Sequence, residues 1–340
     1  MINRINSLIK TTDRKGVVQG GKSSCELFTL YLNQLPAQVN GGEPATNLLH
    51  SVSKEYVDDV NTVSKGKDLN DLKISIEKDL QSLTKYLVNH MMKVNESKTQ
   101  IMFTKPKEPI EELTVKFNGS TIKHQKDIKI LGITISSNQK FDKHLTAGST
   151  NMTKSIRYKS TLLRAAKPFL PLRTLAMIGN NLINSTIMYG APIWGSSSLK
   201  NIEIVQAAQT KVVRMLMGST WGRDNTTHRQ KIFSEIGWPN VQQIILMASS
   251  NLVRKAGLNQ SSQGLNTMIK KKQKKSQRHG HIMRLEHCGP ANRKSDTFSS
   301  KATQQFNVLP TALKDPLIST AAFKKKLKEH AMSTYLLKEH

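Results

Sequence analysis

LLHSVSKEYVDDVNTV, residues 48–63, is the segment from which the architecture of the chain can be worked out. Apolar and β-branched residues on both sides of YVDD (56–59) predict two short strands joined by a tight turn. Adjacent side chains of a straight strand point to opposite faces, whereas a turn allows Asp58 and Asp59 to point to one place. Such a carboxylate pair can hold divalent cations, but Asp-Asp is also ordinary in a surface turn. Both interpretations stay open on these residues alone.

The segments that follow alternate between helical and strand patterns and then become helical. Apolar residues three and four apart, from Leu69 to Leu87, predict an amphipathic helix. Strands are expected at 98–104 and 128–136, with a hairpin between them that turns at Asn118-Gly119. The expected helices lie at 67–90, 145–167, 172–189, 200–217 and 319–337. The predicted fold class is therefore α+β, with an antiparallel sheet and helices first and a mostly helical part afterwards.

The charge of the chain indicates its partner. Lys and Arg number 51 against 24 Asp and Glu, a formal net charge of +27. This excess favours a polyanion, because each phosphate neutralised by Lys or Arg releases a condensed counterion. The densest basic run, MIKKKQKKSQRHGHIMR at 268–284, contains seven Lys or Arg and no acid. We predict nucleic-acid contacts from Lys270, Lys271, Lys272, Lys274, Lys275 and Arg278. A nuclear localisation signal and a solvated tract are the alternatives.

The cysteines and the apolar stretches indicate the compartment. Cys25 and Cys288 are the only cysteines, so a disulfide framework is not expected and a reducing compartment fits. The first residues form no apolar signal-peptide core, and no stretch is long enough to cross a membrane. We therefore expect an intracellular protein without a membrane partner, with the nucleus as one candidate compartment.

A glycine loop near the beginning of the chain has two interpretations. Residues 16–23, GVVQGGKS, satisfy the phosphate-binding pattern G-x-x-x-x-G-K-S. In a P-loop nucleotidase Lys22 would reach the β- and γ-phosphates and Ser23 would hold Mg²⁺. That motif requires a buried strand leading into the loop, whereas residues 10–15 are wholly polar. The P-loop is therefore the less favoured interpretation, beside a plain Gly-rich turn.

The loop also begins a longer block, GVVQGGKSSCELFTLYLNQLP (16–36). This block resembles one in the reverse transcriptases of LINE-type (non-LTR) retrotransposons, written G-V-x-Q-G-x-x-x-S-P-x-L-F-x-x-Y-x-N-x-L-P. Its matching residues are Gly16, Val17, Gln19, Gly20, Ser24, Leu27, Phe28, Tyr31, Asn33, Leu35 and Pro36. Cys25 replaces the usual Pro. The resemblance implies that Gln19 and Gly20 contact the template and the incoming nucleotide, where small residues allow close backbone approach.

YVDD follows this block at the order and spacing that reverse transcriptases show. By that resemblance Asp58 is the principal ligand and Asp59 a secondary ligand of two Mg²⁺ ions. One ion would activate the 3′-hydroxyl of the primer, and the other would steady the leaving pyrophosphate. Tyr56 would lie under the primer end.

The resemblance continues in register beyond YVDD. Residues 80–103 look like the helix and strand of the family that end in N-x-x-K-T-x-x-M-x-F. This likeness implies that Lys98 acts as a general acid, which protonates the leaving pyrophosphate. The alternative interpretation is that Lys98 is a solvated lysine of a strand. Residues 128–145 resemble the primer-grip hairpin, with Leu131-Gly132 at its turn. Weaker likenesses to jockey-like elements follow at 161–195, 202–218, 233–243 and 298–330.

The resemblance implies three parts: a partial polymerase palm at 1–143, a helical thumb at 144–218, and a helical, basic C-terminal region at 219–340. Within the last part, a polar stretch near 257–300 is expected to be a linker or mobile arm. The implied function is RNA-directed DNA synthesis, with an RNA template, a DNA primer, deoxynucleotides and Mg²⁺.

A further palm carboxylate of the family has no counterpart before Gly16, because Asp13 is too close to the glycine loop. We therefore expect the chain as given not to polymerise DNA by itself. A non-catalytic nucleic-acid-binding remnant is the alternative function from a different class.

Overall fold

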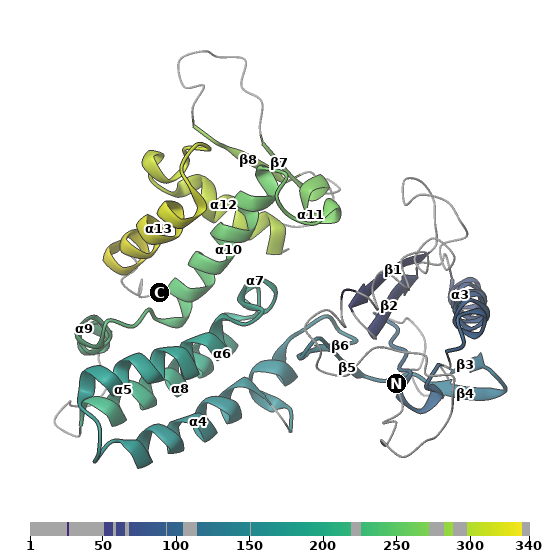
Figure 1. The fold of residues 1–340 in the computed structure, drawn as a ribbon, viewed down its shortest axis with the longest axis horizontal. Helices are drawn as coiled ribbons and strands as arrows, with labels where there is room; N and C mark the ends of the chain where they lie inside the picture. Colours follow the sequence, from purple (N-terminus) through teal and green to yellow (C-terminus); the bar gives the residue numbers. More distant parts are fainter. Residues whose placement is uncertain are drawn as a thin grey trace, which may run out of the picture. The chain divides into compact units, whose positions relative to one another are not determined.

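The computed structural model describes residue 26 and residues 51–56, 59–64, 68–92, 94–104, 114–149, 151–218, 226–271, 282–287 and 298–334 (Figure 1). Two compact units divide the chain at residue 128, so that the first comprises 1–128 and the second 129–340. The described elements confirm an α+β chain, mostly helical with small sheets. Where one antiparallel palm sheet was expected, the described strands pair only in twos.

The first unit contains two antiparallel hairpins and a long helix. β1 (Ser51–Tyr56) pairs with β2 (Asp59–Ser64), and β3 (Thr114–Phe117) pairs with β4 (Ser120–Lys123). Helix α3 (Leu69–Asn89) confirms the helix predicted at 67–90. It begins where it does because Asp68 caps it, with Oδ1 accepting from the Asp71 N–H at 2.8 Å.

Helix α3 anchors both hairpins of this unit. Its first half packs against the β3–β4 hairpin, whose buried cluster consists of Ile101, Phe103, Val115, Phe117 and Ile122. Its second half carries the buried Tyr86, against which Val60 of β2 packs. The Ser64 hydroxyl at the end of β2 also donates to Asp79 of α3 at 3.1 Å. Both contacts hold the β1–β2 hairpin against α3.

The strand predicted at 98–104 is wrong. A 3₁₀ turn, η1 (Glu96–Lys98), ends where the strand should begin, and Asn95 caps it by accepting from the Lys98 N–H at 3.2 Å. Beyond it, Ile101 forms an isolated parallel bridge with His124. Ile101 and Phe103 are nevertheless buried, so the alternating pattern correctly indicated which side chains face the core.

The chain continues with a third hairpin and a group of helices. β5 (Asp127–Ile130) pairs with β6 (Ile133–Ser136), and a π-helical turn, η3 (Lys143–Ala147), follows. The next helices are α4 (Met152–Ala166), α5 (Leu172–Gly179), η4 (Asn180–Asn184), α6 (Ser185–Met188), α7 (Ala191–Trp194), α8 (Leu199–Met217) and α9 (Thr226–Ile236). The helices predicted at 172–189 and 200–217 are confirmed. The helix predicted from 145 begins at Met152, where Asn151 caps it.

These helices enclose the larger of the two cores of this unit. Trp194 and Trp238 are fully buried, and each ring nitrogen donates to a backbone carbonyl, of Tyr189 at 2.9 Å and of Ala176 at 3.0 Å. Gln209 is also fully buried, and its amide donates to Asn184 at 2.8 Å and to the Pro239 carbonyl at 2.9 Å. Buried polar groups are tolerated when satisfied in this way. These bonds join α8 to η4 and to the segment that follows α9.

The remaining elements form a second core. They are α10 (Val241–Gly257), α11 (Gln263–Met268), β7 (Ile269–Lys271), β8 (Leu285–His287), α12 (Phe298–Val308), η6 (Thr311–Leu313) and α13 (Thr320–Thr334). Arg254 of α10 is only 2% exposed; it donates to the Ile318 carbonyl at 2.6 Å and lies 4.7 Å from the Phe323 ring centre. The helix predicted at 319–337 is confirmed as α13.

The expected linker at 257–300 requires correction. Within that range α11, β7, β8 and the start of α12 are regular elements, and Ile269 and Leu285 belong to the second core. The polar composition concealed this order because each strand supplies few apolar residues. Residues 272–281 and 288–297 lie outside the described part. None of the described helices is long and apolar enough to span a bilayer.

Candidate functional site

The YVDD segment lies at the end of the β1–β2 hairpin. The strands are in register from Ser51 opposite Ser64 to Tyr56 opposite Asp59. Only residues 57 and 58 connect them, so the predicted strand-turn-strand is confirmed, with β1 running further than expected. Asp59 is exposed at the first position of β2. Asp58 lies outside the described residues.

The described part of this hairpin suits a hard cation only in part. Carboxylate oxygens are the donors that Mg²⁺ prefers, and the exposed Asp59 offers one such group. Among the described residues, however, no three His, Cys, Asp or Glu side chains lie together as a metal site would require. Asp59 can therefore be one ligand of a larger set.

Lys98 is exposed at the end of η1, not in a strand. Asn95 organises this turn: its side chain accepts from the Lys98 N–H and from the Ser97 hydroxyl, at 2.7 Å for the latter. The Thr99 hydroxyl donates to the Asn95 carbonyl at 2.9 Å. The backbone at Lys98 is thus held firmly while its ammonium group remains in solvent.

Leu131 and Gly132 form the turn between β5 and β6, as predicted. Both have left-handed backbone conformations, with φ of 46° and 83°. That conformation strains a leucine, which is 41% exposed here. The side chain of Leu131 is therefore presented outward on a two-residue turn.

Tyr189 supports this turn from 58 residues away in the sequence. Its hydroxyl donates to the Leu131 carbonyl. Its ring lies against Gly132, where an added Cβ would be 3.5 Å from the ring. Sequence reasoning placed Tyr189 in the helical region but missed this contact, because nothing in the local pattern links the two segments.

Two histidines follow the turns of β3–β4 and β5–β6, of which His124 is half-buried and His144 is buried. Burial first, and then the nearby Lys126, lower the pKa of His124, whose Nδ1 accepts the Phe103 N–H at 3.0 Å. Burial first, and then Lys129, lower the pKa of His144. His144 is 8% exposed, and its Nε2 has no hydrogen-bond partner among the described residues. Burial therefore favours the neutral form of both rings.

Lys270 and Lys271 are exposed on β7. They are the described members of the predicted basic contacts, since Lys272, Lys274, Lys275 and Arg278 lie outside the described residues. Gln19 and Gly20 also lie outside them. The described candidates fall in separate parts: Asp59 and Lys98 in the first unit, and Leu131, Gly132, Lys270 and Lys271 in the second.

Comparison with known families gives the context of these residues. Residues 2–135 match the profile of the family described as reverse transcriptase (RNA-dependent DNA polymerase). The matched range includes the glycine block, YVDD, Lys98 and the Leu131-Gly132 turn.

Curated relatives from flies extend the match into the helical part. The "RNA-directed DNA polymerase from mobile element jockey" of Drosophila funebris is 22% identical over 209 residues, 61% of this chain and 22% of the relative. The "Probable RNA-directed DNA polymerase from transposon X-element" of Drosophila melanogaster is 27% identical over 247 residues, 68% of this chain and 26% of the relative. The chain thus spans about a quarter of the length of these relatives. No solved structure matches it.

Proposed function

We propose that this chain, whose residues 2–135 form part of a LINE-type reverse-transcriptase domain, acts in RNA-directed DNA synthesis by a non-LTR retrotransposon. The observation that carries the proposal is the β1–β2 hairpin. A connection of two residues, 57 and 58, sets Asp59 directly opposite Tyr56, so that YVDD forms the end of this hairpin within a sequence that matches the family. The substrates are an RNA template, a DNA primer and deoxynucleotides.

In this proposal residues 1–143 are the partial palm and residues 144–218, with the helices from α4 to α8, form the thumb. Asp58 and Asp59 hold Mg²⁺, which when bound supplies charge neutralisation at the transferred phosphoryl group. Lys98, with its backbone fixed by Asn95 and its ammonium group exposed, donates a proton to the leaving pyrophosphate. Tyr56, Leu131 and Gly132 position the primer end.

The glycine loop has its role in the same reaction. The family match covers residues 16–23, which favours the polymerase interpretation of this loop over the P-loop interpretation. Gln19 and Gly20 then contact the template and the nucleotide. Lys22→Ala is expected to leave ATP hydrolysis unchanged, and loss of hydrolysis in this variant would restore the P-loop interpretation.

A metal-binding measurement tests the proposed carboxylate pair. Mn²⁺, a paramagnetic substitute for Mg²⁺, is titrated into the isotope-labelled chain, and broadening of amide signals is followed. We expect the signals of residues 59–61 to broaden first, and Asp58→Asn with Asp59→Asn to remove this broadening. Glu235→Gln, which removes an exposed carboxylate of α9, is the matched control and should change nothing there.

Equal broadening of these signals in the wild type and the double variant would overturn the proposed metal site. Extension of a DNA primer on an RNA template, abolished by Asp58→Ala, would establish the reaction itself. Salt-dependent binding of nucleic acid with no metal localised at the hairpin would favour the second candidate, a non-catalytic nucleic-acid-binding protein. The net charge of +27 is the observation that keeps this candidate open.

A further inference from the structure

An exposed apolar stripe runs along the junction of α4 and α5. Its four large side chains are Tyr158 and Leu162 of α4, Phe169 of the connecting loop and Met177 of α5. Their exposed fractions are 69%, 51%, 83% and 62%. Single exposed apolar side chains are ordinary, whereas several gathered on one surface mark an interaction site.

Tyr158 and Leu162 lie on the side of α4 that is next to α6. They are four residues apart, so they share one face of the helix. The adjacent Lys159 donates from its ammonium group to the hydroxyl of Thr186 in α6, which identifies the side of α4 that meets the second helix. Both apolar side chains therefore stand beside the junction of the two helices.

Met177 and Phe169 continue the stripe. α5, η4 and α6 follow one another without a break, and Ile178 and Leu182 precede Thr186 at steps of four residues. Such steps place all three residues on the side that faces α4. Met177 comes one position before Ile178, at the exposed border of that side. Phe169 lies in the loop that joins α4 to α5.

Arginines border the stripe. Arg157 and Arg164 of α4 and Arg173 of α5 are exposed. No Asp or Glu occurs in the sequence between Asp142 and Glu203. The helices that carry the stripe therefore present positive charge beside their apolar side chains and contribute no carboxylate of their own.

This composition is that of a protein interface. Aromatic residues, Met and Arg are enriched at the centres of protein–protein interfaces, whereas Lys is depleted there. Tyr and Arg are also frequent among the residues that carry most of the binding energy. Nucleic-acid backbones are contacted mainly by Lys, Arg and small polar side chains. A surface of that second kind lies on α13, with the exposed Lys324, Lys325, Lys326 and Lys328.

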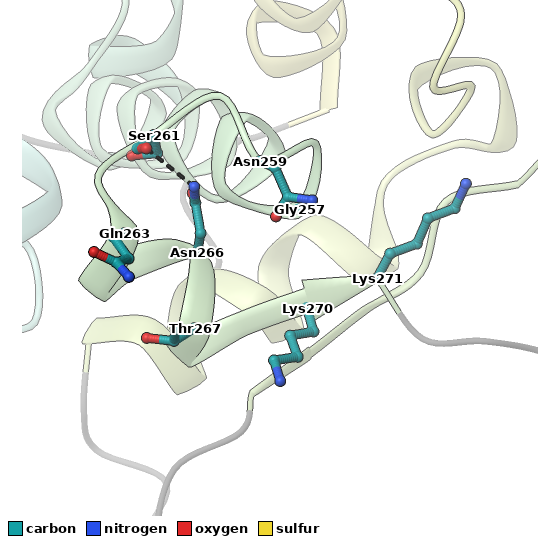
Figure 2. A pocket seen from close by; sticks show the side chains of 8 residues that line it. All are labelled: Gly257, Asn259, Ser261, Gln263, Asn266, Thr267, Lys270 and Lys271. Atoms are coloured by element: carbon teal, nitrogen blue, oxygen red, sulfur yellow. Dashed lines mark hydrogen bonds between the residues drawn. The ribbon is translucent and has the colours of Figure 1, made fainter. Parts of the chain in front are cut away.

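The hollow beside β7 lacks the composition of the stripe. It has a volume of about 610 Å³ and lies between the end of α10, α11 and β7 (Figure 2). Lys270 and Lys271 are successive residues of β7 and point to opposite faces, as Figure 2 shows. The lining is more apolar than polar but includes no large apolar side chain. The hollow therefore gathers neither charge nor apolar anchors for a ligand.

We propose that the stripe on α4 and α5 binds an amphipathic helix of another protein, with acidic residues on both sides of the apolar face of that helix. Packing of an apolar helix face along a hydrophobic surface between helices is a recurring mode of recognition. From Tyr158 to the end of α4 at Ala166 the stripe is about 12 Å long, and Phe169 extends it. Carboxylates of the partner complement the bordering arginines.

A second copy of the chain fits this surface less well. A two-fold axis places the same patch of both subunits together, so Arg157, Arg164 and Arg173 of one copy would face those of the other. The net charge of +27 on each copy adds to this repulsion. The partner is therefore a different, acidic chain.

Fluorescence anisotropy of a labelled peptide with the full chain tests the proposal. The probe is a helical peptide of about 18 residues, with Leu at positions i, i+4, i+7 and i+11 and Glu on both sides of them. Leu162→Gln with Met177→Gln should weaken binding about tenfold, because two apolar anchors are lost. Glutamine is close to Leu and Met in helix propensity, so both helices should persist.

The matched control is Val308→Gln with Leu317→Gln, which makes a similar change at two highly exposed apolar side chains elsewhere. These substitutions should leave binding of the peptide unchanged. Equal losses in the two double variants, or no binding of the peptide to the wild type, would overturn the proposed surface.

The charge of the partner is tested separately. Arg157→Gln with Arg164→Gln should weaken binding of the peptide about threefold and reduce its dependence on salt. Lys324→Gln with Lys325→Gln removes the same charge from α13 and is the control. Equal losses would show attraction by net charge alone and contradict the proposal. A peptide with Lys in place of Glu should bind at least about tenfold more weakly, and equal binding of the two peptides would overturn the acidic partner.

Two other occupants would give different results in Leu162→Gln with Met177→Gln. Equal weakening of an RNA–DNA duplex and of the peptide would assign the stripe to nucleic acid. Sedimentation that shows a dimer in the wild type and a monomer in this variant would assign it to a second copy. Either result would overturn the proposal, whereas a monomeric chain with unchanged duplex affinity supports it. Binding of the peptide should be the same in Asp58→Ala, because the stripe is independent of the proposed catalysis.

Discussion

Two hairpin turns of this chain adopt the same backbone from different residues. Asn118-Gly119, between β3 and β4, has φ of 48° and 80°, and Leu131-Gly132, between β5 and β6, has φ of 46° and 83°. Asn-Gly is the pair that such a turn prefers, whereas leucine is disfavoured in the left-handed region. The first turn is therefore specified by its own sequence, and the second must be held by something else.

The support of the second turn is tertiary. An added Cβ at Gly119 would meet nothing within 4 Å, whereas at Gly132 it would meet the Tyr189 ring. The Tyr189 hydroxyl also holds the Leu131 carbonyl. Backbone strain of this kind persists only where the surroundings over-determine it, and it concentrates at functional positions. The strained turn is the one that we propose contacts the primer.

Exchanging the first residues of the two turns should give the largest effect. Asn118→Leu should destabilise the β3–β4 hairpin by about 1–2 kcal/mol, because leucine, unlike asparagine, has no polar side chain to offset the left-handed conformation by a local hydrogen bond. Leu131→Asn should stabilise the β5–β6 hairpin by about 1 kcal/mol, since asparagine tolerates that conformation. Hydrogen exchange of peptides covering 114–123 and 127–136 measures each hairpin separately.

The controls for these substitutions are Lys116→Gln and Lys129→Gln, at an exposed position of β3 and of β5, which should change hydrogen exchange little. If Leu131→Asn accelerates exchange, the leucine side chain makes contacts that outweigh the strain. The two turns would then not be equivalent, and the comparison would fail.

Removing the hydroxyl that supports the second turn should have the next largest effect. Tyr189→Phe keeps the ring against Gly132 and should destabilise the second unit by about 1 kcal/mol, because one hydrogen bond is lost. Trp194, Trp221 and Trp238 all lie in this unit, so urea unfolding followed by tryptophan fluorescence reports it. Tyr158→Phe, in a tyrosine that is 69% exposed on α4, is the matched control.

Combining Tyr189→Phe with Leu131→Asn shows whether the two residues act together. If the hydroxyl holds the strained turn, its loss should matter less once asparagine relieves the strain. Strictly additive effects would mean that Tyr189 stabilises the unit in another way.

The two turns also show what the sequence could and could not predict. Both turn positions were predicted, one from Asn-Gly itself and one from the resemblance to the primer-grip hairpin. The YVDD hairpin was predicted because β-branched residues flank it, and the long helices were predicted from their spacing. The strand at 98–104 was wrong because the capping preference of Asn95 overrode the alternating pattern.

What escaped prediction depends on contacts between distant segments. No residue pattern near Leu131 predicts its hydrogen bond with Tyr189. The hollow beside β7 lies in a segment whose polar composition indicated a linker. Its described elements pack because isolated apolar residues such as Ile269 and Leu285 enter a core built by α10, α12 and α13. Composition averages over a segment, whereas packing depends on individual side chains.

The smallest expected effect is a pH dependence that both hairpins share. Burial, with Lys126 or Lys129 nearby, lowers the pKa of His124 and His144 from the ordinary value of 6.5. The folded pKa therefore lies below the unfolded one, and between the two values the unfolded chain binds more protons. The stabilisation from each neutral ring is present above 6.5 and is lost as the pH falls below it toward the folded pKa.

The two histidines should respond differently to that protonation. In His124 a proton on Nδ1 would face the Phe103 N–H and break that bond, whereas in His144 protonation would bury a charge without a partner. The hydrogen exchange of both hairpins, corrected for intrinsic rates, should therefore become faster as the pH is lowered from about 7.5 to about 5.5. His144→Gln should flatten this dependence for β5–β6 only, and His124→Gln for β3–β4 only. A dependence that survives both substitutions would place the titrating group elsewhere in the chain.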